Sequence, residues 1–311
     1  MKILLLGRDG QVGWELQRSL APLGELVALG RVAASNPDGL CGDLTQLDAL
    51  AQTVRAVRPD VIVNAAAYTA VDQAENEPEL TRTLNAWAPG VLADEAQALG
   101  AWLVHYSTDY VFDGSGDQPW KEGDDTGPLS VYGSTKLEGE QAVAQRCQRH
   151  LIFRTGWVYA ARGDNFAKTM LRLAQTRETL QVIDDQWGAP TGAELLADVT
   201  AHAIRQAVTS SIPTQGPALT GVYHLAASGY TSWYAYAKYV ISLVDTAQPA
   251  IKRVATEIKP VPTTSFPTLA KRPHNSRLDT TKLRTTFGLA LPPWQAGVNR
   301  MLSEIDYGRI S

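Results

Sequence analysis

Cysteine is scarce in this chain, and long runs of apolar residues are absent. Only Cys41 and Cys147 occur among 311 residues, and their separation matches no common metal-ligand spacing. Isolated cysteines are typical of reduced, inert thiols, so we expect a protein of the cytoplasm. No stretch approaches the ~20 apolar residues of a transmembrane helix, and Met1–Leu6 is too short for the apolar part of a signal peptide. We therefore expect no membrane partner.

The chain also lacks a strong excess of either charge. Its 28 lysines and arginines against 32 aspartates and glutamates leave a formal charge of −4. This balance gives no electrostatic basis for binding nucleic acid or an anionic membrane surface. The 44% hydrophobic content is that of a globular protein, and 311 residues suit one large α/β domain with a smaller one attached.

Three glycines, spaced three residues apart, follow the first predicted strand at residues 2–6 and precede a helical pattern at residues 14–20. A dinucleotide's diphosphate needs a tight turn, bare backbone and a helix N-terminus in this order. We therefore predict a dinucleotide site here, with a glycine-rich turn that binds nothing as the alternative. The residues of this turn assigned to the cofactor are Gly7, Gly10, Gln11, Val12 and Gly13.

The end of the second predicted strand, residues 26–29, bears on which dinucleotide binds. Gly30 and Arg31 follow this strand. NAD sites usually place an acidic residue here for the ribose 2′-hydroxyl, whereas an arginine suits a 2′-phosphate. Arg31 therefore favours NADPH over NADH, although a solvated surface arginine fits the same position. Asp43 and Leu44 would flank the adenine, and an aspartate that stabilises a turn is the alternative.

Strands and helices alternate through the first half of the chain. Strand 61–64 is followed by the small residues Ala65, Ala66 and Ala67, and the apolar strand 101–104 continues towards Ser107. This alternation predicts right-handed βαβ units and a doubly wound parallel sheet of the Rossmann type. Ligands bind at the carboxyl ends of such strands, so the glycine turn, the alanines and the hydroxyl groups should meet there.

Tyr132 and Lys136 are separated by one helical turn, so their side chains share a face. A free tyrosine has a pKa of ~10, and a nearby ammonium group would lower that pKa. Tyr132 would then serve as a general acid or base. The alternative is a surface tyrosine packed on a lysine stem, because this four-residue spacing also arises by chance.

The regular alternation fades in the second half. We predict a dinucleotide-binding domain over residues 1–157 and a smaller α/β substrate domain over residues 158–311. Part of the later chain, about residues 180–220, is expected to return to the first domain.

A proline-rich stretch leads to a cluster of basic side chains. Three prolines between residues 259 and 267 predict an extended loop. Residues 271–277 then hold four lysine, arginine or histidine side chains. Such local density suits an anion such as a diphosphate, and a solvated basic loop is equally compatible with it.

With these residues in view, the chain resembles the extended short-chain dehydrogenase/reductases and, within them, the family of dTDP-4-dehydrorhamnose reductases. The likeness covers nearly the whole chain, and its later blocks are specific to this family rather than to the superfamily. The blocks that carry it are Gly7–Gly13, Val63–Ala67, His105–Phe112, Tyr132–Lys136, Arg154–Tyr159, Asn165–Met170, Gln186–Thr191 and Arg272–Arg277.

The resemblance implies hydride transfer from NADPH or NADH to the C4 ketone of dTDP-4-dehydro-β-L-rhamnose, giving dTDP-β-L-rhamnose. Tyr132 would donate the proton, Lys136 would hold the nicotinamide ribose, and Thr108 would bind the substrate carbonyl. Tyr106 would lie at the cofactor. The residues expected around the dTDP-sugar are Thr108, Asp109, Trp157, Asn165, Lys168 and Arg272.

The resemblance also implies two features beyond the reaction. Family members often pair their subunits, so a homodimer is expected. Some members hold a magnesium ion through glutamates, and Glu15, Glu194 and Glu304 stand at matching positions. Three surface glutamates on helices are the alternative interpretation.

Two other functions occur on this fold. Nucleotide-sugar dehydratases usually carry Asp-Glu directly after the threonine, whereas here Asp109 is followed by Tyr110, which disfavours elimination. Non-catalytic, NADP-binding regulatory subunits tend to lose the Tyr/Lys pair or the substrate-loop residues, and both are intact in this chain. Reduction is therefore the prediction, with a related dTDP-6-deoxy-4-ketohexose as the alternative substrate.

Overall fold

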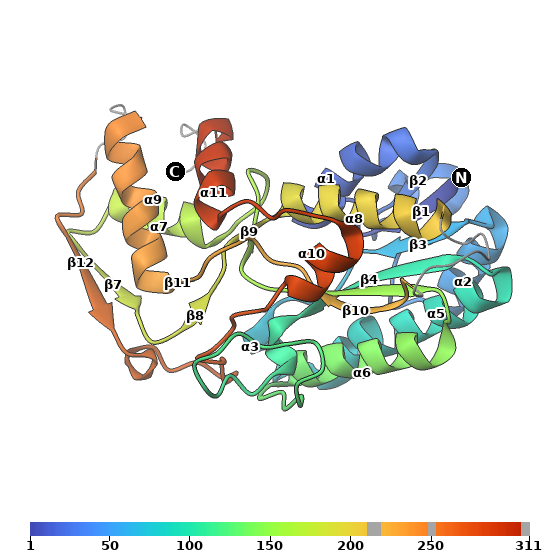
Figure 1. Cartoon of the computed structure of the whole chain (residues 1–311), viewed down its shortest axis with the longest axis horizontal. Helices are drawn as coiled ribbons and strands as arrows, with labels where there is room; N and C mark the ends of the chain where they lie inside the picture. Colours follow the sequence, from blue (N-terminus) through green and yellow to red (C-terminus); the bar gives the residue numbers. More distant parts are fainter. Residues whose placement is uncertain (210–218, 248–252, 306–311) are drawn as a thin grey trace.

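A six-stranded parallel sheet forms the centre of the larger lobe (Figure 1). The computed structural model describes residues 1–209, 219–247 and 253–305. The strand order is β10-β5-β4-β3-β1-β2, and every neighbouring pair is parallel, which confirms the predicted doubly wound sheet. The strands are β1 Lys2–Leu6, β2 Glu25–Leu29, β3 Val61–Asn64, β4 Trp102–Thr108, β5 His150–Thr155 and β10 Gly221–His224.

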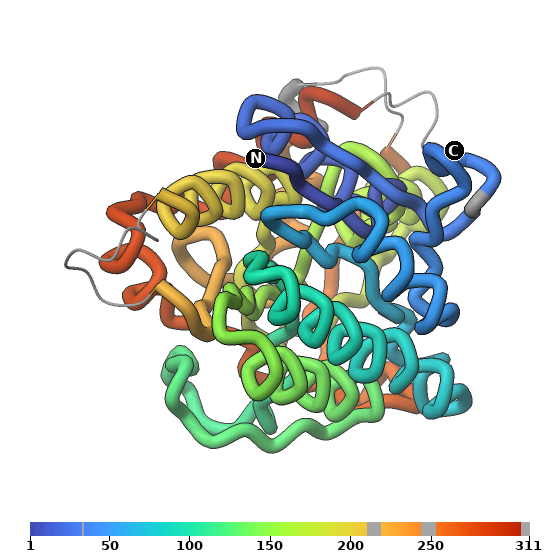
Figure 2. The backbone as a smooth tube through the Cα atoms, turned by 90° about the vertical axis from the view of Figure 1, so that its right-hand side faces the viewer, coloured from blue at the N-terminus to red at the C-terminus, as the bar shows by residue number. Residues whose placement is uncertain are grey.

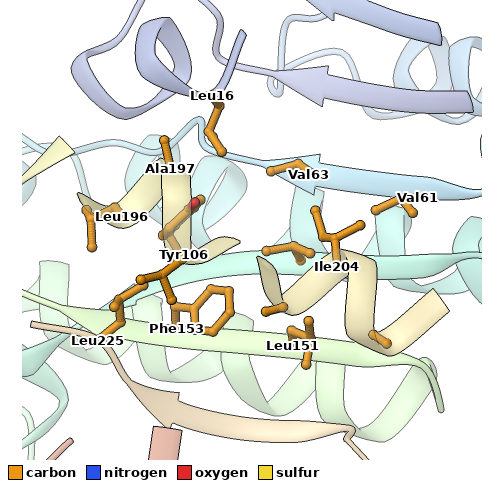
Figure 3. Close-up of a cluster of buried hydrophobic side chains, with 14 of the residues drawn as sticks. Leu16, Val61, Val63, Tyr106, Leu151, Phe153, Leu196, Ala197, Ile204 and Leu225 are labelled. Atoms are coloured by element: carbon orange, nitrogen blue, oxygen red, sulfur yellow. The ribbon is translucent and has the colours of Figure 1, made fainter. Parts of the chain in front are cut away.

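Helices cover both faces of this sheet (Figure 2). The strands are rich in leucine, valine and isoleucine, and the central strand β4 is buried along its whole length, as expected for a sheet covered on both sides. One face packs against α1 and α8, whose Leu16 and Leu196 lie over the side chains of β3 and β4 (Figure 3). The other face packs against α2, α5 and α6. These helices are α1 Gln11–Leu20, α2 Leu47–Val57, α5 Ala88–Leu99, α6 Val131–Arg146 and α8 Ala193–Thr209.

The connection from β3 to β4 is fixed by one buried amide. The short helices α3 Val71–Ala74 and α4 Pro78–Arg82 lead through a π-helical turn at Thr83–Trp87 into α5. Asn85 lies in that turn, binds both the amide and the carbonyl of Tyr68, at 2.9 and 3.1 Å, and donates to Thr135 of α6 at 3.3 Å. The loop that follows β3 is thus held against the helix that carries Tyr132.

The smaller lobe lies on the left in Figure 1 and is built from short strands and three helices. Its apolar clusters are separate from those of the large sheet. Its strand pairs are β7 Thr179–Ile183 with β12 Glu257–Val261, β6 Val158–Tyr159 with β9 Thr191–Gly192, and β8 Trp187–Gly188 with β11 Thr231–Ser232. Its helices are α7 Phe166–Ala174, α9 Trp233–Ala247 and α11 Trp294–Glu304.

The chain crosses between the lobes more than once. Helix α8 returns to pack on α1, strand β10 joins the large sheet, and α10 Thr281–Phe287 contributes Leu283 and Phe287 to the same core. Strand β7, by contrast, stays in the smaller lobe with β12. Across the described ranges, no helix is long and apolar enough to cross a membrane.

The loop predicted over residues 259–267 is wrong for its first three residues. Residues 257–261 form β12, which runs parallel to β7 although position 260 is a proline. Each strand of a two-stranded sheet is an edge, and an edge position tolerates a proline because its missing N–H need not pair.

A buried ion pair ties α6 to the sheet. Arg154 of β5 donates to both carboxylate oxygens of Glu140, at 2.7 to 3.1 Å, and the two side chains are only 6% and 4% exposed. The Arg154 guanidinium also lies 5.1 Å from the ring centroid of Phe112. Because Glu140 follows Lys136 by one helical turn, this pair fixes the helix near the predicted catalytic residues.

We expect Glu140→Gln to lower the free energy of unfolding by about 3–5 kcal/mol, because it leaves the Arg154 charge buried without a counter-charge. Urea titration measures the loss. The control is Glu138→Gln on the same helix, which breaks a bond to Arg82 between side chains 41% and 35% exposed and should cost about 1 kcal/mol or less. Equal losses in the two variants would show that burial of the Glu140 pair carries no special weight.

Candidate active site

The glycine turn packs directly against the residues that follow β3. Gly7 has a φ of 88°, and a Cβ added to it would lie 2.7 Å from the Ala66 nitrogen. A Cβ on Gly13 would overlap the Gly7 carbonyl. Within the described chain no side chain caps α1, and the buried Gln11 Oε1 has no hydrogen-bond partner. Free polar groups at a helix start, beside backbone that admits no side chain, fit a dinucleotide diphosphate.

The tip of β2 carries a second arginine that the sequence interpretation missed. Arg8, in the glycine turn, donates to the carbonyls of Ala28 and Ser35 at 3.0 and 2.7 Å. Its Nε lies 3.4 Å from the position of a Cβ on Gly30. Arg31, which follows Gly30 in the chain, is exposed. A Cβ on Gly30 would overlap Asp9 Oδ2, and Asp9 pairs with Arg8 at 3.7 Å, so a carboxylate and a cation share the position where the cofactor's ribose was predicted. Arg8 and Asp9 escaped notice because only the fold brings the turn to β2.

Asp43 and Leu44 are engaged in the protein itself. Asp43 accepts hydrogen bonds from the amide and hydroxyl of Thr45, at 3.0 and 2.9 Å, which is the turn-stabilising alternative stated above. Leu44 is buried in the core beneath α2. The segment still lies at the predicted place, because a Cβ on Gly42 would be 2.5 Å from the Gly30 carbonyl.

Two residues of the predicted catalytic set, Thr108 and Tyr132, lie with the predicted substrate residue Asp109 at the carboxyl end of β4. The Thr108 hydroxyl hydrogen-bonds the Tyr132 phenol and also donates to Asp109 Oδ1 at 3.1 Å. The rings of Tyr110 and Tyr132 meet edge to face, with centroids 5.7 Å apart. Asp109 is only 1% exposed. A phenol, a hydroxyl and a carboxyl group therefore share one water-poor space.

Burial dominates the electrostatics of this space. It raises the pKa of Asp109 to about 6, against opposing hydrogen bonds from Ser276 and Thr108. It also raises the pKa of Tyr132 to about 12, which is opposite to the lowering by Lys136 that the sequence predicted. The reason is geometric: the Lys136 ammonium donates to the Tyr106 carbonyl at 2.5 Å and lies 3.4 Å from His105 Nε2.

Lys136 itself is only 2% exposed, and burial lowers its pKa to about 8. Its contact at Tyr106 is with the backbone, since the Tyr106 hydroxyl bonds to Thr200 at 2.6 Å on the α8 side of the sheet. His105, and Asn64 behind it, were not identified from sequence. Both are polar residues inside apolar strands, which is the signal that could have revealed them.

Trp157 combines a strained backbone conformation with a side chain held by stacking. It has a φ of 51°, in the region that favours glycine, and its ring stacks on Trp233 with centroids 3.4 Å apart and planes at 9°. A Cβ on Gly188 would lie 2.6 Å from the Trp157 indole. The preceding Gly156 is similarly close to Asp109, because its Cβ would be 2.5 Å from Oδ1. The backbone that precedes Trp157 therefore lies against the buried carboxyl group.

Asn165 and Lys168 shape a turn that reaches the other lobe. Asn165 caps α7 by accepting from the Lys168 amide at 3.2 Å, and Lys168 Nζ donates to the carbonyls of Ala161 and Gly163. Gly163 lies against the side chain of Gln11. Asn165 and Lys168, both predicted substrate residues, thus stabilise the turn at Gly163, which lies against the glycine turn.

The basic loop reaches the same place from the C-terminal side. Arg272 pairs with Asp72 of α3 at 2.6 Å, and Asp72 also accepts the Ala270 amide at 3.1 Å. Arg272 interacts with Tyr110, and Ser276 hydrogen-bonds Asp109. The loop predicted to bind an anion is therefore at the site, but its arginine is paired with a carboxylate that sequence reasoning did not select.

The three glutamates gather around one cation. Arg300 bonds Glu304 at 2.9 Å and interacts electrostatically with Glu194 and Glu15, whereas Glu15 also pairs with Arg18 at 3.3 Å. Among the residues that the structure describes, no group of three or more His, Cys, Asp or Glu side chains could hold a metal ion.

Known proteins resemble this chain over nearly its full length. Residues 1–307 match the family described as RmlD substrate binding domain. The chain is 56% identical over 305 residues to the dTDP-4-dehydrorhamnose reductase of Escherichia coli K12, covering 98% of each. The corresponding figures for the Burkholderia thailandensis reductase are 45% over 305 residues, covering 98% of this chain and 99% of the relative.

Two solved structures are also similar. A dTDP-4-dehydrorhamnose reductase from Clostridium acetobutylicum has a TM-score of 0.85 at 34% identity, covering 97% of this chain and 99% of the other. The reductase from Bacillus anthracis, solved in complex with NADP, has a TM-score of 0.83 at 32% identity, with the same coverage of 97% and 99%.

We expect Gly188→Ala to displace the Trp157 indole, because the new methyl group would lie 2.6 Å from it. Near-ultraviolet circular dichroism should lose the signal of the Trp157–Trp233 stack, and stability should fall by about 1–3 kcal/mol. Gly123→Ala is the control, since a Cβ there meets no described atom within 4 Å. An unchanged tryptophan signal in Gly188→Ala would contradict this packing.

Proposed function

This chain belongs to the dTDP-4-dehydrorhamnose reductase family, and from that membership we propose that it reduces the C4 ketone of dTDP-4-dehydro-β-L-rhamnose to dTDP-β-L-rhamnose with NADPH or NADH. The observation that supports the proposal is the pairing of Tyr132 with Thr108 at the carboxyl end of β4, where Lys136 binds the Tyr106 carbonyl two residues earlier on the same strand. These are the groups that a carbonyl reduction needs.

The pKa shifts indicate the protonation states of Tyr132 and Lys136 at neutral pH. When bound, a reduced nicotinamide cofactor supplies the hydride. Tyr132, whose pKa is raised to about 12, stays protonated at neutral pH and is therefore a proton donor. Thr108 holds the phenol by a hydrogen bond and is placed to bind the same carbonyl oxygen. Lys136, whose pKa is lowered to about 8, is charged at neutral pH.

We assign the remaining predicted residues by their place around this centre. The glycine turn and Ala65–Ala67 would hold the diphosphate and ribose of the cofactor. Asp109 would contact the sugar because it accepts a hydrogen bond from Thr108, and Trp157 because it follows Gly156, which lies against Asp109. Asn165, Lys168 and Arg272 would lie around the nucleotide part. This division makes residues 1–157 the cofactor domain and residues 158–311 mainly the substrate domain.

NADPH is the favoured cofactor in this proposal. Arg31 is exposed next to Gly30, so its positive charge would face a 2′-phosphate, whereas Arg8 at the same turn is paired with Asp9 at 3.7 Å. The Bacillus anthracis relative was solved in complex with NADP.

We propose a homodimer from the family resemblance, and the cytoplasm as its compartment from the scarcity of cysteine. The resemblance also implies a magnesium ion at Glu15, Glu194 and Glu304, which a chelator tests, although in the described structure Arg300 lies among these carboxylates. A related dTDP-6-deoxy-4-ketohexose is the alternative substrate. A regulatory role without catalysis is disfavoured by the intact Tyr132 and Lys136.

The decisive assay follows NADPH or NADH consumption with enzymatically made dTDP-4-dehydrorhamnose, with and without EDTA. We expect the wild type to turn over and Tyr132→Phe to lose about 100-fold or more in turnover, because phenylalanine has no proton to give. Cofactor binding, measured by fluorescence titration, should be retained. An inactive wild type would refute the proposed reaction, and near-normal rates in Tyr132→Phe would refute the assigned donor.

Arg31→Ala should weaken NADPH binding about tenfold, because it removes a cation from the 2′-phosphate, and should leave NADH binding nearly unchanged. Dissociation constants for both cofactors provide the measurement. Arg149→Ala is the control. Arg149 is exposed and comes just before β5, so it lies at the amino ends of the strands, whereas the proposed cofactor site is at their carboxyl ends. Equal losses for both cofactors would reduce Arg31 to a surface residue.

A further inference from the structure

A buried polar line leads from Lys136 into the sheet. His105 of β4 lies between Lys136 and Asn64 of β3, with its Nε2 3.4 Å from Lys136 Nζ and its Nδ1 3.2 Å from Asn64 Nδ2. Asn64 and His105 are each 1% exposed, and Lys136 is 2% exposed. The Asn64 Oδ1 accepts the backbone amide of Ala66 at 3.2 Å. The roles assigned above to residues of the site do not include His105 or Asn64.

The backbone amide of Ala66 gives this line a direction. Because that N–H can only donate, Asn64 must present its oxygen to Ala66 and its NH₂ group to His105. The His105 Nδ1 is then the acceptor, so the single ring proton of the neutral imidazole is on Nε2. That N–H points at Lys136 Nζ, which can accept it only as an uncharged amine.

A charged Lys136 cannot be accommodated without a mismatch. An ammonium would donate to Nε2 and move the ring proton to Nδ1, where it faces the Asn64 NH₂ group. Turning the Asn64 amide removes that conflict but sets its NH₂ group against the Ala66 N–H. Either way two donors face each other in a buried place, which is unfavourable. The line therefore favours the neutral amine.

Some of the other groups around Lys136 favour its charged form, and others favour its neutral form. The Tyr106 carbonyl accepts from Nζ, and Glu140, one turn along α6, favours the charged form while paired with Arg154 of β5. Tyr132 precedes Lys136 by one turn on α6. The Tyr106 phenol, on β4, bonds to Thr200 rather than to Lys136. Burial lowers the pKa of Lys136 to about 8 and keeps His105 uncharged by lowering its pKa as well.

We propose that His105 is a positioning residue that stabilises the uncharged form of Lys136 by donating Nε2–H to Nζ. The proposal rests on the reduction proposed above. In one turnover the reduced nicotinamide would give the hydride that forms the C4–H bond, and Tyr132 gives its proton to the carbonyl oxygen. Because Lys136 Nζ is directed at the Tyr106 carbonyl, it passes a proton to the resulting phenolate through a water molecule. Lys136 is left as the amine that His105 stabilises, and water reprotonates Lys136 before the next turnover.

The first test uses the full-length protein without ligands, so that it does not depend on the reaction. Nitrogen-15 NMR of its five histidines should show His105 as the Nε2–H tautomer at pH values above the pKa of Lys136. His105→Gln identifies the resonance. A His105 that holds its proton on Nδ1 across the whole titration would accept from Lys136, and this result would overturn the proposal.

A matched pair of substitutions tests the effect on Lys136. Methionine and glutamine have similar length, but only glutamine offers an N–H to Nζ. The pKa of Lys136, followed with ¹³Cε-labelled lysine and assigned with Lys136→Met, should rise in His105→Met and return towards the wild-type value in His105→Gln. An unchanged or lower pKa in His105→Met would refute the role of His105.

Kinetics then connect this role to the reaction. His105→Met should lower kcat about tenfold at neutral pH and enlarge the solvent deuterium isotope effect, because proton return becomes slower, whereas His105→Gln should restore both. A normal isotope effect in His105→Met contradicts the proposal. A wild-type enzyme inactive on dTDP-4-dehydrorhamnose would refute the proposed function instead, and the NMR result would still decide on His105.

Discussion

The hydrogen bond from the Lys136 ammonium to the Tyr106 carbonyl sets the register between helix α6 and strand β4. Because Tyr132 lies one turn before Lys136, this bond also decides where the phenol stands relative to the end of the strand. Thr108 and Asp109 follow Tyr106 by two and three residues, so the three groups arrive at one place. Glu140 and Asn85 fix the same helix from other sides.

Two segments of the second half complete the centre from outside the sheet. Trp157, in a conformation unusual for its residue type, is kept in place by Trp233 and by the absence of a side chain at Gly188. The basic loop approaches through Arg272 and Ser276. These contacts bring residues of the second half of the chain to the carboxyl edge of the large sheet.

The pKa shifts indicate how firmly Tyr132 and Lys136 each hold a proton. Burial holds Tyr132 in its neutral, donating form and also weakens the hold of Lys136 on its proton. At neutral pH both residues therefore carry a proton, which is the state that the proposed reduction uses. The sequence interpretation, in which the ammonium lowers the tyrosine pKa, described the pair as if it stood alone in solvent.

The sequence by itself determined the architecture, because hydrophobic strands that alternate with amphipathic helices can bury both faces of a sheet in few other ways. It also identified the glycine turn and Tyr132–Lys136, since local spacing carries their chemistry. It could not reveal β12, because a proline-bearing segment becomes a strand only when β7 lies beside it.

Only the tertiary structure determined which groups contact each charged side chain. Arg8 at the tip of β2, Asp72 on Arg272 and the line from Ala66 to Lys136 join positions far apart in the chain. The strength of such contacts depends on burial and on the direction of each donor, and neither quantity is encoded in local spacing.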